Sequence, residues 1–224
     1  MKFYDFKRLV IGIVYPNACP FCEEKIKYDE FLCEECAKKI SPTPDDMPIA
    51  LTDFVCVTSY DSFTDKAIFS LKNGTILAAA SVMAHYLSKK LDASDFDVVT
   101  AVPLHPQDKK LRGFNHSELI AKELAQMLKR PYRRRLKKIR RTKPQKALKY
   151  SERIVNMEGA FAVTKPRKVE GKRILLIDDV CTTGSTLSEC ENTLRQAKAS
   201  SIKCAAFAKT ILKHKEKQDC QKSE

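Results

Sequence analysis

The sequence has no apolar run long enough to cross a bilayer, and it is short of acidic residues relative to basic ones. Lys and Arg together number 41 against 28 Asp and Glu, which gives a formal net charge of +13. The first absence excludes a membrane span, since a transmembrane helix needs about 20 consecutive apolar residues. With 224 residues, 43% of them hydrophobic, the chain is predicted to be soluble and globular, with one substantial core and a small additional module.

A good secretory signal is also missing. Early positive charges, the apolar run Leu9–Val14 and Cys19 are features of a weak secretory or lipoprotein signal. The run is too short for the apolar region of a signal, and the residues before the cysteine, Pro16, Asn17 and Ala18, form a poor cleavage site. We expect this segment to form a short helix that packs on the protein.

The cysteines do not describe a disulfide framework. Five of the nine lie outside any paired spacing: Cys56, Cys181, Cys190, Cys204 and Cys220. Cys56, Cys181 and Cys204 fall on or beside predicted strands, where a reduced cysteine behaves as a small hydrophobic residue. This usage predicts a cytoplasmic protein with free thiols.

The other four cysteines form two CxxC pairs separated by ten residues: Cys19, Cys22, Cys33 and Cys36. Two such pairs supply four thiolates in the tetrahedral arrangement that structural zinc prefers, and an all-thiolate site leaves no open position for chemistry. A redox CxxC is the alternative, but it is disfavoured because the pairs lie outside a thioredoxin-like context. We expect a small zinc-finger module whose metal supplies much of its folding free energy.

Residues Ile174–Leu187 read ILLIDDVCTTGSTL and carry the strongest chemical signal. Four consecutive apolar residues predict a strand buried on both faces, as in a parallel sheet. Asp178 and Asp179 follow at its carboxyl end, and a loop of small residues then begins a helix. The backbone N–H groups of such a loop form an anion site, whereas the carboxylates suit the paired hydroxyls of a sugar. The segment therefore predicts a pocket for a ribose 5-phosphate.

This phosphate loop is not a Walker loop, because the GxxxxGK[ST] spacing and its lysine are missing. An ordinary strand–turn–helix is the plain alternative. The segment ILLIDDVCTTGST instead resembles the 13-residue phosphoribosyl diphosphate (PRPP) fingerprint of the type I phosphoribosyltransferases. By that resemblance the 5-phosphate would be cradled by Cys181, Thr182, Thr183, Gly184, Ser185 and Thr186.

Elements of the two kinds alternate along the rest of the chain. Strands are predicted over 54–60, 96–102, 159–163 and 202–208, and helices over 63–71, 76–91, 115–128 and from the phosphate loop to about 197. Asn115 is expected to cap its helix with Glu118 as the reciprocal partner. Residues 41–48, with three prolines, read as a linker. The alternation predicts an α/β fold with a parallel sheet flanked by helices.

Residues Lys129–Arg153 contain thirteen Lys or Arg and one acid, Glu152. One interpretation is a solvated loop and edge strand. A second is a mobile loop that closes over a diphosphate and excludes water, formed by Arg140, Arg141, Thr142, Lys143, Pro144 and Gln145. A third is a backbone-binding patch for nucleic acid, which would bind with little base stacking because only two aromatic residues, Tyr132 and Tyr150, lie here.

The chain as a whole resembles the ComF/GntX-type family, competence-associated proteins that join an N-terminal zinc finger to a phosphoribosyltransferase domain. The resemblance rests on a collinear series: the paired CxxC motifs, Lys72–Gly74, Val102–Pro106, Leu111–Asn115, Arg141–Thr142 with Gln145, Arg153, Asn156, Gly159–Phe161 and the PRPP fingerprint. It implies residues 1–46 as helix, zinc finger and linker, 47–212 as the phosphoribosyltransferase-like domain, and 213–224 as a polar tail.

The resemblance also implies site residues. Asp178 and Asp179 would hold the ribose hydroxyls, directly or through Mg²⁺ that arrives with PRPP, and Arg140 and Arg141 would cover the diphosphate. Further diphosphate-side candidates are Pro103, Leu104, His105, Arg112 and Lys72. The implied activity is phosphoribosyl transfer with release of magnesium diphosphate, in the service of DNA uptake. The alternative is a non-catalytic PRPP or nucleotide sensor that binds single-stranded DNA and accompanies a helicase of DNA uptake.

Two positions depart from relatives of this kind. Thr182 stands where hypoxanthine-type enzymes have an aspartate that serves the purine base, which makes hypoxanthine–guanine salvage less expected. His116 stands where the family often has glutamine. His85 and His214 carry no motif and are expected on the surface.

Overall fold

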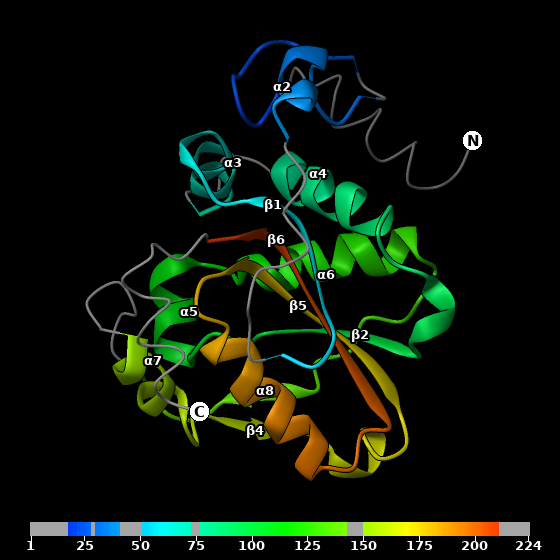
Figure 1. The fold of residues 1–224 in the computed structure, drawn as a ribbon, viewed down its shortest axis with the longest axis vertical. Coiled ribbons are helices and arrows are strands. Elements are labelled where there is room, and N and C mark those ends of the chain that lie inside the picture. Colours follow the sequence, from blue (N-terminus) through cyan, green and yellow to red (C-terminus); the bar gives the residue numbers. More distant parts are fainter. Residues whose placement is uncertain (1–17, 28–29, 41–50, 73–76, 143–149, 211–224) are drawn as a thin grey trace.

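The structure, a computed structural model, describes residues 18–27, 30–40, 51–72, 77–142 and 150–210 (Figure 1). The predicted N-terminal helix, the linker at 41–48, residues 143–145 of the basic loop, His214 and the polar tail lie outside the described residues, and the side chain of Lys72 is also not described. Within the described part of the chain, no helix is both long and apolar enough to span a membrane.

Four parallel strands form the central sheet, in the order β1 (Phe54–Ser59), β6 (Ser201–Lys209), β5 (Arg173–Cys181) and β2 (Val98–Ala101). β5 is paired on both sides, which explains its apolar, non-alternating sequence. The strand also runs four residues past the predicted apolar stretch, because β6 continues to pair with it as far as Cys181. The predicted parallel α/β sheet is confirmed.

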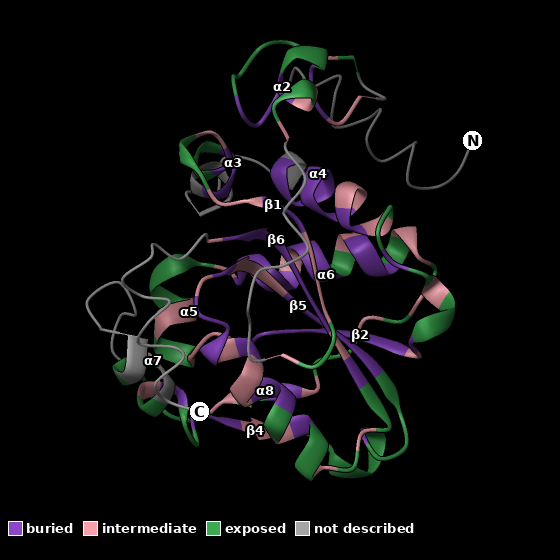
Figure 2. Cartoon of the chain, in the orientation of Figure 1, coloured by how far each residue is buried: buried purple, intermediate pink, exposed green. Residues whose placement is uncertain are grey.

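Helices cover both faces of this sheet (Figure 2). On one face, α4 (Leu77–Ser88) and α6 (His116–Met127) pack against Leu175 and Ile177 of β5. On the other, α8 (Ser185–Gln196) packs against Ile174 and Leu176. Alternate residues of one strand thus enter two cores, and each fully buried side chain contributes about 1.5–3 kcal/mol to folding.

The remaining elements do not belong to the central sheet. These are α3 (Ser62–Lys72), α5 (Pro106–Arg112), α7 (Tyr150–Met157), the 3₁₀ turns η1 (Ala93–Asp95) and η3 (Pro166–Lys168), and a separate antiparallel pair, β3 (Leu136–Lys138) with β4 (Phe161–Val163). The strand predicted over 159–163 therefore exists, but it pairs with β3 outside the main sheet. β3 is the edge strand that one interpretation of the basic stretch expected.

The N-terminal module packs directly on the larger domain. Its helix α2 (Glu34–Lys38) lies beyond α3 and α4 in Figure 1. The rings of Phe21 and Phe63 stack with centroids 4.4 Å apart. Those of Phe31 and His85 stack at 4.3 Å. His85, predicted to be an ordinary surface residue, is half-buried and contacts the module through this stack.

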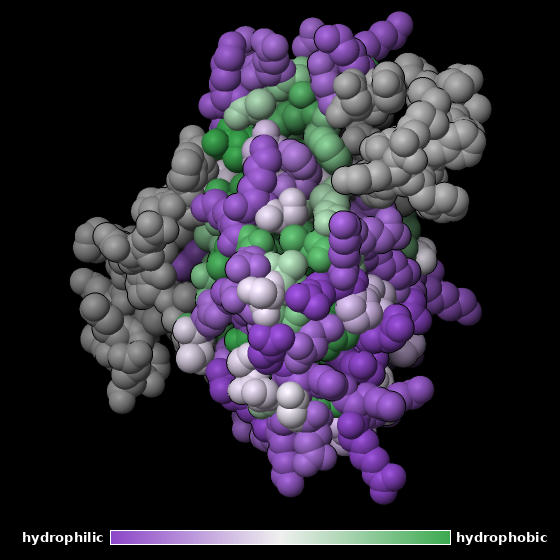
Figure 3. Space-filling model, turned by 90° about the vertical axis from the view of Figure 1, so that its right-hand side faces the viewer, coloured by the Kyte–Doolittle hydropathy of each residue, from purple (hydrophilic) through white to green (hydrophobic). Residues whose placement is uncertain are grey.

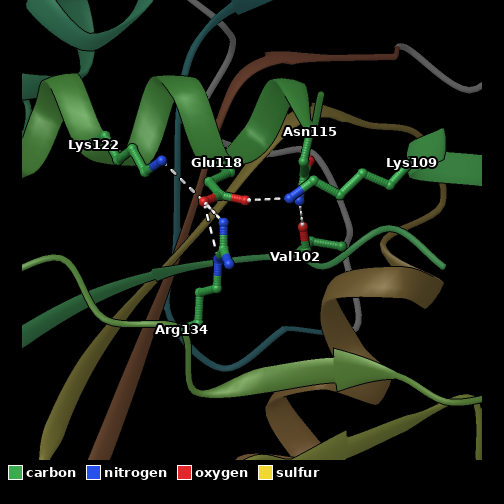
Figure 4. Close-up of polar contacts among 6 residues, drawn as sticks. All are labelled: Val102, Lys109, Asn115, Glu118, Lys122 and Arg134. Atoms are coloured by element: carbon green, nitrogen blue, oxygen red, sulfur yellow. Dashed lines mark hydrogen bonds and ion pairs between the residues drawn. The ribbon is translucent and has the colours of Figure 1, made fainter. Parts of the chain in front are cut away.

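The predicted capping box of α6 is also wrong. Asn115 precedes the helix but its side chain makes no cap hydrogen bond; its Nδ2 donates instead to the carbonyl oxygen of Val102 at 2.8 Å. The Glu118 carboxylate turns away from the helix end and forms ion pairs with Lys109, Lys122 and Arg134 (Figure 4). Both side chains find partners on other elements, and these replace the local cap.

Candidate functional site

The two acidic residues of the site lie near the carboxyl end of β5. Asp178 Oδ1 accepts hydrogen bonds from Ser117 Oγ at 2.7 Å and from the backbone N–H of Asp179 at 2.9 Å. Asp179 Oδ1 accepts one from the N–H of Val180 at 2.8 Å. The carboxylates are therefore held in defined positions, with Ser117 supplied by the first turn of α6.

This environment disfavours the ionised form of Asp178. Burial, and then the neighbouring Asp179 carboxylate, raise the pKa of Asp178 to about 8. At neutral pH the protonated form therefore predominates in the free protein. Hydroxyl donors or a divalent cation at this point would favour the ionised form, so the acidic pair is suited to such a ligand.

The loop after β5 forms a small hollow next to the acidic pair. Its volume is about 20 Å³, and Asp178, Val180, Cys181, Thr182, Gly184, Ser185, Thr186 and Leu187 line it. Gly184 has φ +83°, a conformation that a glycine adopts at no steric penalty, and it turns the chain into α8. The first turn of α8 has no acidic residue. Loop and helix start together have the properties of a phosphate cradle.

Three of the predicted phosphate-loop side chains make contacts within the protein or are buried in it. Thr183 Oγ1 and Ser185 Oγ lie 3.0 Å apart within the loop. The thiol of Cys181 is buried, and burial followed by the charge of Asp178 raises its pKa to about 12. The thiol therefore stays protonated at neutral pH. A phosphate in this loop would thus meet mainly backbone N–H groups and hydroxyls.

The predicted diphosphate-side residues divide into two groups. Pro103 and Leu104 line a cavity of about 150 Å³ between β2 and β3, together with Lys109 and Lys138. His105 instead caps α5, where its Nδ1 accepts from the N–H of Gln107 at 3.4 Å. Arg112 is exposed at the end of the same helix.

The two arginines predicted to cover a diphosphate are engaged with protein groups. Arg141 forms an ion pair with Asp108 at 3.2 Å. Arg140 donates to the carbonyl oxygens of Asn156 at 3.0 Å and of Glu158 at 2.6 Å. In this arrangement both residues connect the loop after β3 to neighbouring elements, so covering a diphosphate would require these contacts to change.

Sequence reasoning missed Ser117 and Lys138 as site residues. Ser117 lies two residues after Asn115, just beyond a motif that was noted only for its family resemblance. Lys138 was counted within the basic stretch without a role of its own. Period-two alternation along β3 could have separated its inward side chain from that of Lys137, but three residues are too few for that signal.

The four paired cysteines converge as predicted. Their Sγ atoms all lie within 4.8 Å of one another, and those of Cys22 and Cys33 are 3.6 Å apart. Tetrahedral zinc with Zn–S bonds of about 2.3 Å needs sulfurs just under 4 Å apart, so the cluster fits the metal. Burial, followed by contacts with the neighbouring cysteines, raises the pKa of Cys36, and a bound cation would offset that effect.

The fold and the site define a type I phosphoribosyltransferase-like domain joined to a four-cysteine zinc-ribbon module. Comparison with known proteins agrees. Residues 115–223 match the family described as "Phosphoribosyl transferase domain" and residues 10–47 the "Double zinc ribbon domain".

Several similar proteins carry names that refer to competence or DNA utilization. The "DNA utilization protein YhgH" of Salmonella typhimurium is 25% identical over 200 residues, covering 87% of this chain and 85% of that protein. "Competence protein F" of Haemophilus influenzae is 30% identical over 115 residues, half of each chain. "Competence protein ComFC" of Bacillus subtilis is 37% identical over 106 residues, covering 47% of this chain and 41% of that one. The chain is similar to these proteins, in agreement with the resemblance noted in its sequence.

Proposed function

We propose that the protein binds PRPP with Mg²⁺ and acts on its 5-phosphoribosyl group in connection with DNA uptake. The observation that carries this proposal is the contiguity of two features: an acidic pair in which burial disfavours the ionised form of Asp178, and a small hollow at the start of α8. The acidic pair suits sugar hydroxyls or Mg²⁺, and the hollow suits a 5-phosphate. PRPP with its magnesium ion presents the hydroxyls, the cation and the 5-phosphate together.

In the proposed reaction a nitrogen nucleophile attacks C1′ of the ribose, the C1′–O bond breaks, and magnesium diphosphate leaves with the bonding electron pair. Asp178 and Asp179 would orient the ribose, and the phosphate loop would hold its far end. Magnesium would come with PRPP, since it binds through substrate phosphates and water rather than through a dedicated protein cage.

Isothermal titration with PRPP and Mg²⁺ tests the binding step. Wild-type protein should give saturable heat, and the double variant Asp178→Asn/Asp179→Asn should bind at least about tenfold more weakly, which corresponds to about 1.4 kcal/mol. Absence of binding by the wild type would refute the proposal. A panel of purine and pyrimidine acceptors, followed by diphosphate release, then separates transfer from recognition without turnover.

A second candidate function, binding of single-stranded DNA by the basic stretch, is favoured by uncompensated charge. Of nine basic residues between Lys129 and Thr142, Arg134 and Arg141 alone form ion pairs with described acidic residues. Arg133 and Lys137 are exposed, and Arg135 Nε is buried without a described partner. Phosphate groups are the anions that such a surface would attract.

A salt series of single-strand affinity tests this second function. Each phosphate contact adds about −0.7 to the slope of log affinity against log salt. The variant Arg133→Gln/Lys137→Gln should therefore bind more weakly and with a shallower slope. The matched control is Arg167→Gln/Lys168→Gln, which removes two exposed cations from η3. A slope unchanged in the first variant, or equally reduced in both, would argue against a defined patch.

A further inference from the structure

Tyr60 and Asp65 form a hydrogen-bonded pair at the carboxyl end of β1 that the proposed PRPP site does not use. Tyr60 directly follows β1, and its phenol donates a hydrogen bond to Oδ1 of Asp65 in the first turn of α3. The tyrosine is half-buried, whereas the aspartate is exposed. The pair therefore presents an aromatic side chain and an accessible carboxylate at one point on the edge of the sheet.

A row of backbone hydrogen bonds relates this pair to the phosphate loop. The N–H of Tyr60 donates to the carbonyl oxygen of Lys209 at 2.7 Å, and the N–H of Thr210 donates to that of Cys181 at 2.9 Å. The register of the sheet also places Ser59, Lys209 and Cys181 side by side. Tyr60 therefore lies two strand spacings, about 10 Å, from the start of the phosphate loop.

Of the two acidic residues between the end of β1 and the end of α3, Asp65 is the one whose carboxylate is open to a ligand. Asp61 caps α3, because its Oδ1 accepts hydrogen bonds from the N–H of Thr64 at 2.7 Å and from Thr64 Oγ1 at 2.9 Å. Within the described ranges, no Lys or Arg forms an ion pair with Asp65, although the chain carries a net charge of +13.

Contacts with the cysteine module hold α3, and with it Asp65, in place. The ring of Phe63 stacks on that of Phe21 with centroids 4.4 Å apart, and Lys39 Nζ lies 5.9 Å from the centroid of the Phe63 ring. A side chain that is fixed by such neighbours can orient a ligand without first being ordered by it. The position of the pair is therefore suited to recognition.

The charges near Tyr60 indicate which chemical groups this edge would accept. Burial, then the hydrogen bond to Asp65 and its charge, and lastly the charge of Asp179 raise the pKa of Tyr60 to about 12. The phenol therefore keeps its proton at neutral pH and remains a donor to Asp65. The contribution from Asp179 agrees with the strand register, which places the pair on the β6 side of the acidic residues. With carboxylates on both sides, this region attracts N–H donors and repels anions.

We propose that Tyr60 and Asp65 bind the acceptor, and that the acceptor is an uncharged nucleobase with an exocyclic amino group. This inference rests on the proposed function and names the substrate class of that site. A nucleophile that displaces the diphosphate approaches C1′ from the opposite face of the ribose. Because the diphosphate-side candidates follow β2, the acceptor would enter from the side of β6 and β1. There the carboxylate would accept from the amino group, and the tyrosine would offer apolar surface to a planar base.

Nucleoside 5′-monophosphates, the products of such a transfer, provide a test that requires no turnover. Two matched pairs are titrated with Mg²⁺ present: adenosine against inosine 5′-monophosphate, and cytidine against uridine 5′-monophosphate. One ring carbon carries an amino group in the first member of each pair and a carbonyl oxygen in the second. In at least one pair, wild type should bind the amino member about tenfold more tightly, a typical gain for one charge-assisted hydrogen bond. Ribose 5-phosphate, which has no base, is the reference ligand.

Two aspartate variants show whether this preference depends on Asp65. Asp65→Asn keeps an acceptor for Tyr60 but removes the charge. It should reduce the amino preference to within about twofold and leave the affinity for ribose 5-phosphate within about twofold of wild type. The matched control is Asp95→Asn, which changes an exposed carboxylate that accepts from Lys203 Nζ at 2.8 Å and precedes β2, at the amino end of the strands. This control should keep the full amino preference.

The outcomes separate the inference from the proposed function. A wild type that binds neither PRPP nor ribose 5-phosphate overturns the proposed function itself. A wild type that binds PRPP but shows no amino preference, or an Asp65→Asn variant that keeps this preference, overturns the acceptor assignment alone. So does an Asp65→Asn variant that loses ribose 5-phosphate to the same extent, since its effect would then be structural. Should Asp65→Asn not fold, as judged by circular dichroism, Tyr60→Phe replaces it; it removes the donor that orients the carboxylate, and an undiminished amino preference would count against the assignment.

Discussion

The environment of Asp178 favours ligand binding but reduces the stability of the free protein. Asp178 lies on β5, an inner strand of the sheet, next to a second carboxylate, with Ser117 as its one side-chain hydrogen-bond donor among the described residues. A structural protein would place an apolar or neutral residue there. The raised pKa means that the folded state carries a group whose charge is favoured only when a partner is bound.

The first prediction is that Asp178→Asn stabilises the free protein, and increasingly so at higher pH. The folded-state pKa of Asp178, about 8, lies above the unfolded value of 3.8. Ionisation therefore favours the unfolded chain, and the penalty grows as pH rises from about 4 to 8. Asparagine keeps the acceptor for Ser117 without the charge. Urea unfolding should show a small gain at pH 5 and a gain larger by about 3–4 kcal/mol at pH 8, since each pKa unit corresponds to about 1.4 kcal/mol.

The control for this prediction is Asp97→Asn. The pKa of Asp97 is lowered to about 2 because it accepts hydrogen bonds from Arg173, so its charge stabilises the fold at neutral pH. This variant should lose stability at pH 8, opposite in sign to Asp178→Asn. If Asp178→Asn proved equally stable or less stable than wild type at both pH values, the environment described for Asp178 would be wrong.

At the scale of elements, local sequence signals located the site strand but not its neighbours. The run from Ile174 to Asp179 was sufficient to predict β5, its burial and its acidic end, because these depend on adjacent residues. The capping box at Asn115 failed because both side chains have stronger partners elsewhere: Asn115 binds the end of β2, and Glu118 binds cations from α5 and from the segment before β3. Such contacts join residues far apart in sequence, which one sequence does not reveal.

The Glu118 cluster fastens α6 to the segment that leads into β3, and our second prediction concerns this connection. The carboxylate is buried, with Lys122 at 3.0 Å and Lys109 at 3.5 Å, and Arg134 donates to it through two nitrogens. Glu118→Gln would leave three cations without their shared anion. We expect a loss of about 2 kcal/mol at pH 7, below the value for a fully buried pair because the cations are partly exposed.

At low pH, the stability difference between wild type and Glu118→Gln should disappear. Burial alone would raise the pKa of Glu118, but hydrogen bonds from Arg134 and Lys122 lower it below 4.5. The stabilisation is therefore present above the unfolded pKa and is lost as pH falls through the lower folded value. Glu170→Gln, which breaks an exposed 3.8 Å pair with Lys198, is the control and should change stability by less than about 0.5 kcal/mol. Equal losses from both variants in denaturant unfolding would contradict the prediction.

At the scale of the whole molecule, the cysteine module and the larger domain share one core. Cys19, Phe21 and Cys36 belong to the same buried cluster as α4, α6 and the β5 face toward them. The spacing of the cysteines predicted the module but not its position, since the stacks of Phe21 on Phe63 and of Phe31 on His85 have no sequence signature.

The face of the molecule shown in Figure 3 carries hydrophilic side chains over most of its lower part, with hydrophobic atoms showing in its upper and middle parts.

Because of this shared core, our third prediction is that the metal stabilises the entire protein. Freshly purified protein should contain about one zinc per chain, and a chelator should lower its melting temperature. Unfolding of the module would uncover Phe63 and His85, and two lost ring stacks amount to about 2 kcal/mol, or about 4–8 °C for a chain of this size.

Two cysteine variants separate the metal from the thiols themselves. Cys22 is exposed, so Cys22→Ser has little effect on packing but removes one ligand; it should lose zinc and melt at the temperature of chelated wild type. Cys56→Ser changes a cysteine of β1 outside the cluster and should keep about one zinc and most of the melting temperature. Metal analysis well below one zinc per chain in the wild type, or a melting temperature that chelation leaves unchanged, would mean that the four thiols meet for another reason. In that case the two ring stacks would hold the module in place without a metal.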